Sequence, residues 1–167
     1  MNEGKKFEED WKKSIPDHVY YFRIRDPAQS FGNNSSNTRF SLKNPFDMIM
    51  FDGDRLMCLE LKSIASGSFP LSMIKDHQIE SLSEANQYHN VIAGLILNNR
   101  DREQTYFLSI IDFVRYIENT EKKSINICDI VEYNGIMVDA EKKRTRYTYD
   151  ISLLLKRLDK VVCLCYN

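Results

Sequence analysis

The sequence has no excess of charge, no closely paired cysteines and no long apolar segment. Its 23 Lys and Arg nearly balance 24 Asp and Glu, so the net charge of −1 does not by itself indicate a nucleic-acid partner. No stretch approaches the roughly 20 apolar residues of a membrane span, and the charged N-terminus lacks the apolar run of a signal peptide. We therefore expect a soluble intracellular protein with no membrane partner.

The four cysteines are Cys58, Cys128, Cys163 and Cys165, and none forms a C-x-x-C pair. This spacing fits neither a zinc site nor a disulfide framework, and it is consistent with a reducing compartment. We assign Cys163 and Cys165 to an apolar terminal strand.

A length of 167 residues with 43% hydrophobic side chains predicts one domain with a real core, spanning residues 1–167. Positive charge is concentrated in two segments. Residues 1–45 hold eight Lys or Arg against six acids, and residues 141–160 hold seven against three, including Arg144 and Arg146. Such segments could follow DNA phosphates, or they could be solvated surface.

The most informative stretch is Asn44–Lys62, NPFDMIMFDGDRLMCLELK. It predicts two short strands, at 46–51 and 56–62, joined by a hairpin turn at Asp52-Gly53-Asp54. Glu60 and Lys62 are two residues apart, so in a strand they point to one face. Together with Asp47, at the start of the first strand, they would meet at one end of the hairpin.

Two carboxylates and a lysine suit a divalent cation and a phosphate. Asp47 and Glu60 would bind the metal, and the carbonyl of Leu61 could be a third ligand. Lys62 would orient or help to deprotonate water, or neutralise charge on the phosphate. The competing interpretation is a solvent face on an edge strand. Because the flanking strands are strongly apolar, burial of the charged pair favours a metal site in a nuclease.

The remaining pattern predicts an α/β protein with a mixed central sheet flanked by helices. Helices are predicted at 3–14, 72–89, 110–118 and 151–158, and further strands at 19–24, 91–97, 105–108 and 136–138. Residues 26–44 form a long polar loop. Its Arg39 and Lys43, with nearby Phe residues, could contact DNA, or the loop could be an ordinary one.

Two helical residues are further candidates for the site. Glu8, or its neighbour Glu9, could approach the metal from the first helix, although surface carboxylates on helices are usually inert. Gln78, near the start of the helix after the hairpin, could hydrogen-bond a water or a phosphate, or be merely solvated.

The ordered motifs resemble those of the RecU-type Holliday junction resolvases, within the PD-(D/E)xK nuclease superfamily. The motifs are Asn2-x-Gly4 with Phe7-Glu8, Phe46-Asp47, Glu60-Leu61-Lys62, Ser68-Phe69-Pro70-Leu71, His77-Gln78-Ile79 and Tyr106-Phe107-Leu108. They span about residues 2–113, and the SFPL and HQI segments are more specific than the D…ExK pattern. The rest of the chain matches weakly.

The resemblance implies a restriction-endonuclease-like core and a homodimer that resolves four-way DNA junctions by paired nicks with Mg²⁺ or Mn²⁺. It implies that Asp47, Glu60 and Lys62 form the active centre, that Glu8 is the N-terminal acid and that Gln78 is the helix glutamine. The loop at 26–44 takes the place of the family's projecting stalk. A phage-encoded or divergent member is implied, acting in the cytoplasm of a bacterial or phage-infected cell. The alternatives are another nuclease of the superfamily acting on flaps, ends or duplex sites, and a non-catalytic junction-binding protein.

Overall fold

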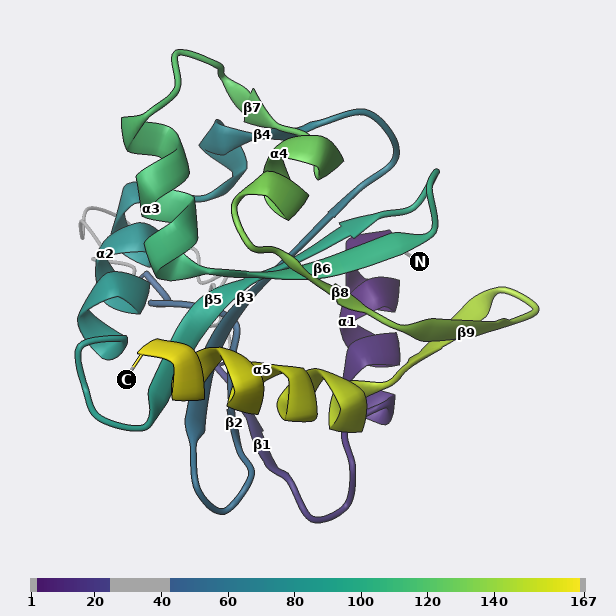
Figure 1. Ribbon diagram of the computed structural model, residues 1–167. Helices are drawn as coiled ribbons and strands as arrows, with labels where there is room; N and C mark the ends of the chain where they lie inside the picture. Colours follow the sequence, from purple (N-terminus) through teal and green to yellow (C-terminus); the bar gives the residue numbers. More distant parts are fainter. Residues whose placement is uncertain (1–2, 25–42, 166–167) are drawn as a thin grey trace, which may run out of the picture.

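The computed structural model describes residues 3–24 and 43–165, with side chains described as far as residue 159. Its centre is a six-stranded mixed sheet in the order β1-β2-β3-β5-β6-β8, with helices on both faces (Figure 1). The prediction of an α/β protein with a mixed sheet flanked by helices is confirmed.

The helices are α1 (Glu3–Lys13), α2 (Asp76–Ala85), α3 (Ile110–Glu118), α4 (Ile127–Glu132) and α5 (Ile151–Cys165), with a 3-10 turn η1 (Leu71–Met73). The sheet strands are β1 (Tyr20–Arg23), β2 (Met48–Phe51), β3 (Leu56–Ile64), β5 (Val91–Asn99), β6 (Gln104–Ser109) and β8 (Ile136–Val138). Two small ribbons pair β4 (Phe69–Pro70) with β7 (Ser124–Ile125), and β9 (Ala140–Lys143) with β10 (Arg146–Tyr149).

The two faces of the sheet are buried by different helices. Met57, Leu59 and Leu61 of β3 pack with residues of α1 and α5. Cys58 lies on the opposite face, in a core shared with α2 and α3. Since side chains alternate along a strand, Glu60 and Lys62 point to the face of Cys58, beneath α2.

The β2–β3 hairpin forms as predicted, and its turn has a clear local cause. Asp52 Oδ1 accepts hydrogen bonds from the backbone N–H groups of Asp54 (3.0 Å) and Arg55 (2.8 Å). Gly53 supplies the positive φ of 106° that the turn requires. β3 then lies between antiparallel β2 and parallel β5. The edge-strand interpretation of Glu60 and Lys62 is therefore wrong.

Two predicted elements differ from the structure. The helix predicted at 72–89 is the shorter α2, because the chain before it first forms β4 against β7 and then η1. The terminal strand predicted at Cys163 and Cys165 is wrong, because α5 continues to Cys165. The first difference depends on pairing with a strand more than 50 residues away, which local periodicity cannot reveal.

None of the helices, over the residues described, combines the length and apolarity that a bilayer crossing needs.

Candidate active site

Asp47 lies against the backbone of β3 and is placed by the hairpin itself. Its N–H donates to the carbonyl of Leu59 at 3.1 Å, and its Oδ2 accepts from the N–H of Leu61 at 2.7 Å. A residue's N–H and C=O point to the same side of a strand, so the Leu61 carbonyl also points towards Asp47. The fold thus brings Asp47 beside the Glu60-Leu61-Lys62 segment, as predicted.

Glu60 is buried, with 1% of its surface exposed. Its Oε1 accepts hydrogen bonds from Lys62 Nζ at 2.5 Å and from Gln78 Nε2 at 2.7 Å. Its Oε2 is also buried, yet no group in the described part of the chain hydrogen-bonds it. A buried carboxylate oxygen without a partner carries a desolvation cost, so this atom requires an explanation.

The pKa of Glu60 is a second sign that its charge is incompletely compensated. Burial raises the pKa of this carboxyl to about 7, and the negative charge of Asp47 adds to the rise. Lys62 and the hydrogen bond from Gln78 oppose it. Two acids are therefore held close enough to repel each other, and one lysine does not fully compensate for their charge.

Gln78 is oriented by the start of α2. Its side-chain Oε1 accepts from the backbone N–H of Lys75, the residue that precedes the helix, at 3.0 Å. This bond fixes the amide so that its NH₂ group faces Glu60. The sequence predicted that Gln78 lies near the site, and the structure places it in contact with Glu60.

Glu8 is held differently from the other candidates. Its carboxylate forms an ion pair with Arg23 of β1. Tyr21, two residues before Arg23, has its pKa raised by burial, lowered by Arg23 and raised by the negative charges of Glu8 and Asp47. The Tyr21 hydroxyl is thus within electrostatic reach of both acids. Tyr21 and Arg23 were not among the predicted site residues, although their spacing of two in a predicted strand places them on one face.

The donor set fits a hard divalent cation. No three His, Cys, Asp or Glu side chains within residues 3–24 and 43–165 form a cluster able to hold a metal. Two carboxylates and one backbone carbonyl are nevertheless a common partial ligand set for Mg²⁺, which keeps several waters. A cation here would satisfy Glu60 Oε2 and remove the repulsion between Asp47 and Glu60.

The predicted DNA-contacting residues fall into three groups. Arg39 lies outside the described residues. Lys43 and Arg144 are exposed. Arg146 instead bonds two acids of α1, with Nη2 3.1 Å from Glu9 Oε2 and Nε 2.5 Å from Asp10 Oδ1.

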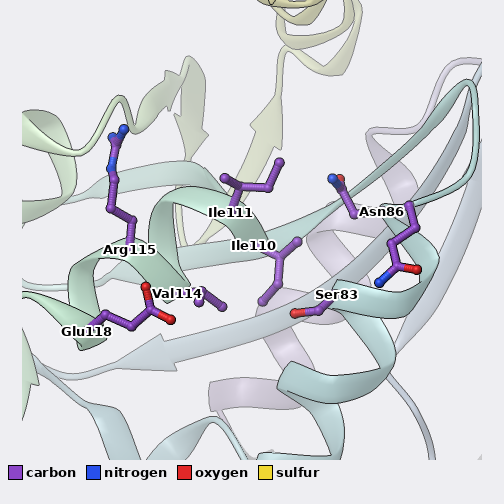
Figure 2. Close-up of a pocket in the computed structure, with 8 residues that line it drawn as sticks. Ser83, Asn86, Ile110, Ile111, Val114, Arg115 and Glu118 are labelled. Carbon is purple, nitrogen blue, oxygen red and sulfur yellow. The ribbon is translucent and has the colours of Figure 1, made fainter.

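A surface hollow of about 460 Å³ lies elsewhere, between α2 and α3. Figure 2 shows Ser83 and Asn86 on one side of it and Ile110, Ile111 and Val114 on the other. None of the candidate catalytic residues lines it. An enclosed hollow is not required for a ligand as large as duplex DNA.

Comparison with known proteins places the chain in a family. The model of the RecU family, described as Recombination protein U, matches residues 12–152. A relative, the SPbeta prophage-derived uncharacterized protein YotM of Bacillus subtilis (strain 168), is 34% identical over 174 residues, covering 95% of this chain and 88% of the relative. Hjc, a Holliday junction resolvase from Archaeoglobus fulgidus, is a remote structural neighbour with a TM-score of 0.47 and 19% identity, covering 81% of this chain and 92% of that one.

The chain therefore belongs to the RecU family. This confirms the resemblance drawn from the ordered motifs. The relative YotM is described as prophage-derived.

Proposed function

We propose that this protein is a divalent-metal-dependent endonuclease that resolves four-way DNA junctions by paired nicks as a homodimer, in the bacterial cytoplasm. The observation that carries the proposal is the buried Oε2 of Glu60, which no described group hydrogen-bonds; it lies beside Asp47, and Lys62 is bonded to the same carboxylate. Membership of the RecU family supports recombination intermediates as the substrate class.

The roles of the residues follow from their contacts. Asp47, Glu60 and the Leu61 carbonyl would hold Mg²⁺, or Mn²⁺ in its place. The cation would supply Lewis-acid stabilisation of the phosphate and a more acidic water. Lys62, held by Glu60, places its ammonium where it can orient water or neutralise charge on the phosphate. Gln78 would keep Glu60 oriented, and Glu8, which pairs with Arg23 of β1, would approach the site from α1.

Substrate selection is assigned to parts of the chain outside this centre. The segment 26–44 would enter the junction centre as a stalk carrying Arg39 and Lys43. A pair of nicks in strands of like polarity needs two active centres related by symmetry, which a homodimer supplies. The runner-up functions are cleavage of flaps, ends or duplex sites, and junction binding without cutting.

The test is a substrate panel with matched metal controls. Purified protein in Mg²⁺ should cut a synthetic four-way junction at paired positions and leave linear duplex of the same sequence intact. Asp47→Asn should bind the junction but not cut it, and calorimetry should show loss of Mn²⁺ binding in that variant. Faster cutting of flaps or duplex than of the junction would favour the alternative function, a nuclease acting on flaps, ends or duplex sites. Tight binding with no cutting in any divalent metal would leave only the binding function.

A further inference from the structure

The hairpin formed by β9 and β10, residues 140–149, stands apart from the central sheet. Among the strands that the structure describes, β9 and β10 pair only with each other, with Lys143 opposite Arg146. Figure 1 shows the hairpin projecting past α1, and its polar contacts with that helix are to the C-terminal half and the residue just after it, at Glu9, Asp10 and Ser14. A two-stranded ribbon is marginally stable alone, so this one needs external support.

That support comes from α1. Buried Asp10 receives Arg146 Nε on Oδ1 at 2.5 Å and the backbone N–H of Tyr147 on Oδ2 at 3.1 Å. The N–H of Tyr149 donates to Ser14 Oγ at 2.9 Å. The Tyr149 ring packs on Phe7 and Trp11. The base of the hairpin is thus fixed rigidly to the helix that carries Glu8.

The hairpin lies at the same end of the sheet as the candidate active centre. β5 is parallel to β3, with Lys62 beside Leu97, so both strands end there. β8 is antiparallel to β6, with Val138 beside Thr105, so the chain leaves β8 at this same end and enters β9. Lys142 also bonds Glu103 in the β5–β6 turn. Three strand spacings separate β3 from β8, about 14 Å, or roughly four base pairs of duplex.

The tip of the hairpin is basic and its backbone is strained. Arg144 has φ of 59°, in a two-residue turn whose first position normally takes glycine. Its side chain is exposed, and no described residue pairs with it. The Lys143 side chain is 71% exposed. Its Nζ lies 3.5 Å from Oε2 of Glu141, whose side chain is also exposed. An arginine at a position that favours glycine points to a use for its side chain.

We propose that this hairpin is an arm that grips the duplex next to the scissile phosphate, with Lys143 and Arg144 bound to phosphates and Arg146 acting as its anchor on α1. The inference rests on the proposed function for the identity of the ligand, DNA. It changes the role of Arg146 from a DNA contact to a positioning residue. It also assigns the sequence-independent part of binding to one element of the fold.

The main experiment measures binding to a linear duplex in EDTA across a salt series, so that it does not depend on cleavage or on junction preference. Lys143→Ala/Arg144→Ala should weaken binding roughly ten- to thirtyfold at 150 mM salt and reduce the slope of log K against log salt by about two. The matched control is Lys13→Ala/Lys156→Ala, which removes two exposed lysines outside the tip. An unchanged slope in the first variant, or an equal change in the control, would overturn the proposal.

Arg144→Gly separates a ligand-binding role from a structural one. Relief of the positive φ should raise the melting temperature by about 2 °C, while duplex binding weakens. A structural arginine would give the opposite result, with lower thermal stability and unchanged binding, and that outcome would contradict the proposal.

Arg146→Gln tests the anchor. Added to Lys143→Ala/Arg144→Ala, it should lower the melting temperature. The slope of log K against log salt should stay equal to that of the double variant. A further reduction of the slope by about one would make Arg146 a phosphate contact and refute its anchoring role. Failure of junction cleavage with these binding results intact would count against the proposed function alone.

Discussion

Two buried carboxylates, Asp10 on α1 and Glu60 on β3, show how differently one protein treats the same chemical group. Both are nearly inaccessible, at 3% and 1% exposure. Asp10 has a donor on each oxygen, from Arg146 and from the backbone of Tyr147. Glu60 has two donors on one oxygen, none on the other among the described groups, and a second acid beside it.

The difference separates a structural acid from a functional one. A buried charge with satisfied oxygens holds elements together, here α1 and the β9–β10 hairpin. A buried charge left partly unsatisfied next to a like charge destabilises the fold unless a ligand binds there. Variants of the two acids should therefore move stability in opposite directions.

The largest expected effect is on cleavage. Asp47→Asn or Glu60→Gln should lower the junction-cutting rate about a thousandfold or more, because each removes a ligand of the cation that stabilises the transition state. Junction binding, measured in Ca²⁺, should stay close to that of the parent. Glu80→Gln, on the exposed side of α2, is the matched control. Equal loss of binding and cutting in the first two variants would contradict their assignment as metal ligands.

Asp10→Ala should destabilise the protein by about 3 kcal/mol, since it leaves Arg146 and the Tyr147 N–H without their buried acceptor. Urea unfolding measures the change. Glu9→Ala is the control, because Glu9 pairs with the same arginine but is half-exposed, and should cost well under about 1 kcal/mol. Similar losses in both variants would remove the distinction between Asp10 and an ordinary surface acid.

Glu60→Gln should instead stabilise the metal-free protein at pH 8 by about 2 kcal/mol. The pKa of Glu60 is raised from 4.5 to about 7 in the folded state, so the folded protein holds this proton more tightly than the unfolded chain. The parent therefore loses stability as pH rises from 4.5 through 7, and the variant lacks this loss. Unfolding in EDTA at pH 5 and pH 8 tests it. A variant less stable than the parent at pH 8 would show that Glu60 is a structural acid like Asp10.

The smallest effect is expected for Gln78→Met, which removes one hydrogen bond to the charged form of Glu60. The pKa of Glu60 should rise further, so Mn²⁺ affinity should fall by about tenfold at pH 6 and much less at pH 8.5. Calorimetry at the two pH values measures this, with Gln87→Met, an exposed glutamine past α2, as the control. The same loss at both pH values would mean that Gln78 acts on α2 rather than on Glu60.

Local sequence was sufficient for the parts of the fold that local interactions decide. The β2–β3 hairpin follows from the Asp52-Gly53-Asp54 turn, and β5 from the apolar run at 91–97. The strand at 136–138 was predicted, but the α2 boundary and the elements β7, α4, β9 and β10 were not, because they depend on pairing between distant segments such as β4 and β7.

In the candidate site, too, contacts within one hairpin were predicted from spacing, whereas contacts between distant segments were not. The spacing of Asp47, Glu60 and Lys62 within one hairpin predicted that they lie close together, and the structure has them so. The contact of Gln78 with Glu60 spans 18 residues and was expected from the family motif rather than from spacing. The Arg23–Glu8 pair was missed because nothing in the sequence states how α1 lies against β1.

The sequence by itself determined a hairpin with two acids and a lysine on one apolar strand, and through its ordered motifs the RecU family. Tertiary structure alone decided that β3 is central, so that Glu60 is buried and its charge is costly. It also decided that Arg146 pairs with Asp10, 136 residues before it in the chain. The physical reason is that a side chain's role depends on which groups surround it, and for these residues the surrounding groups come from distant parts of the chain.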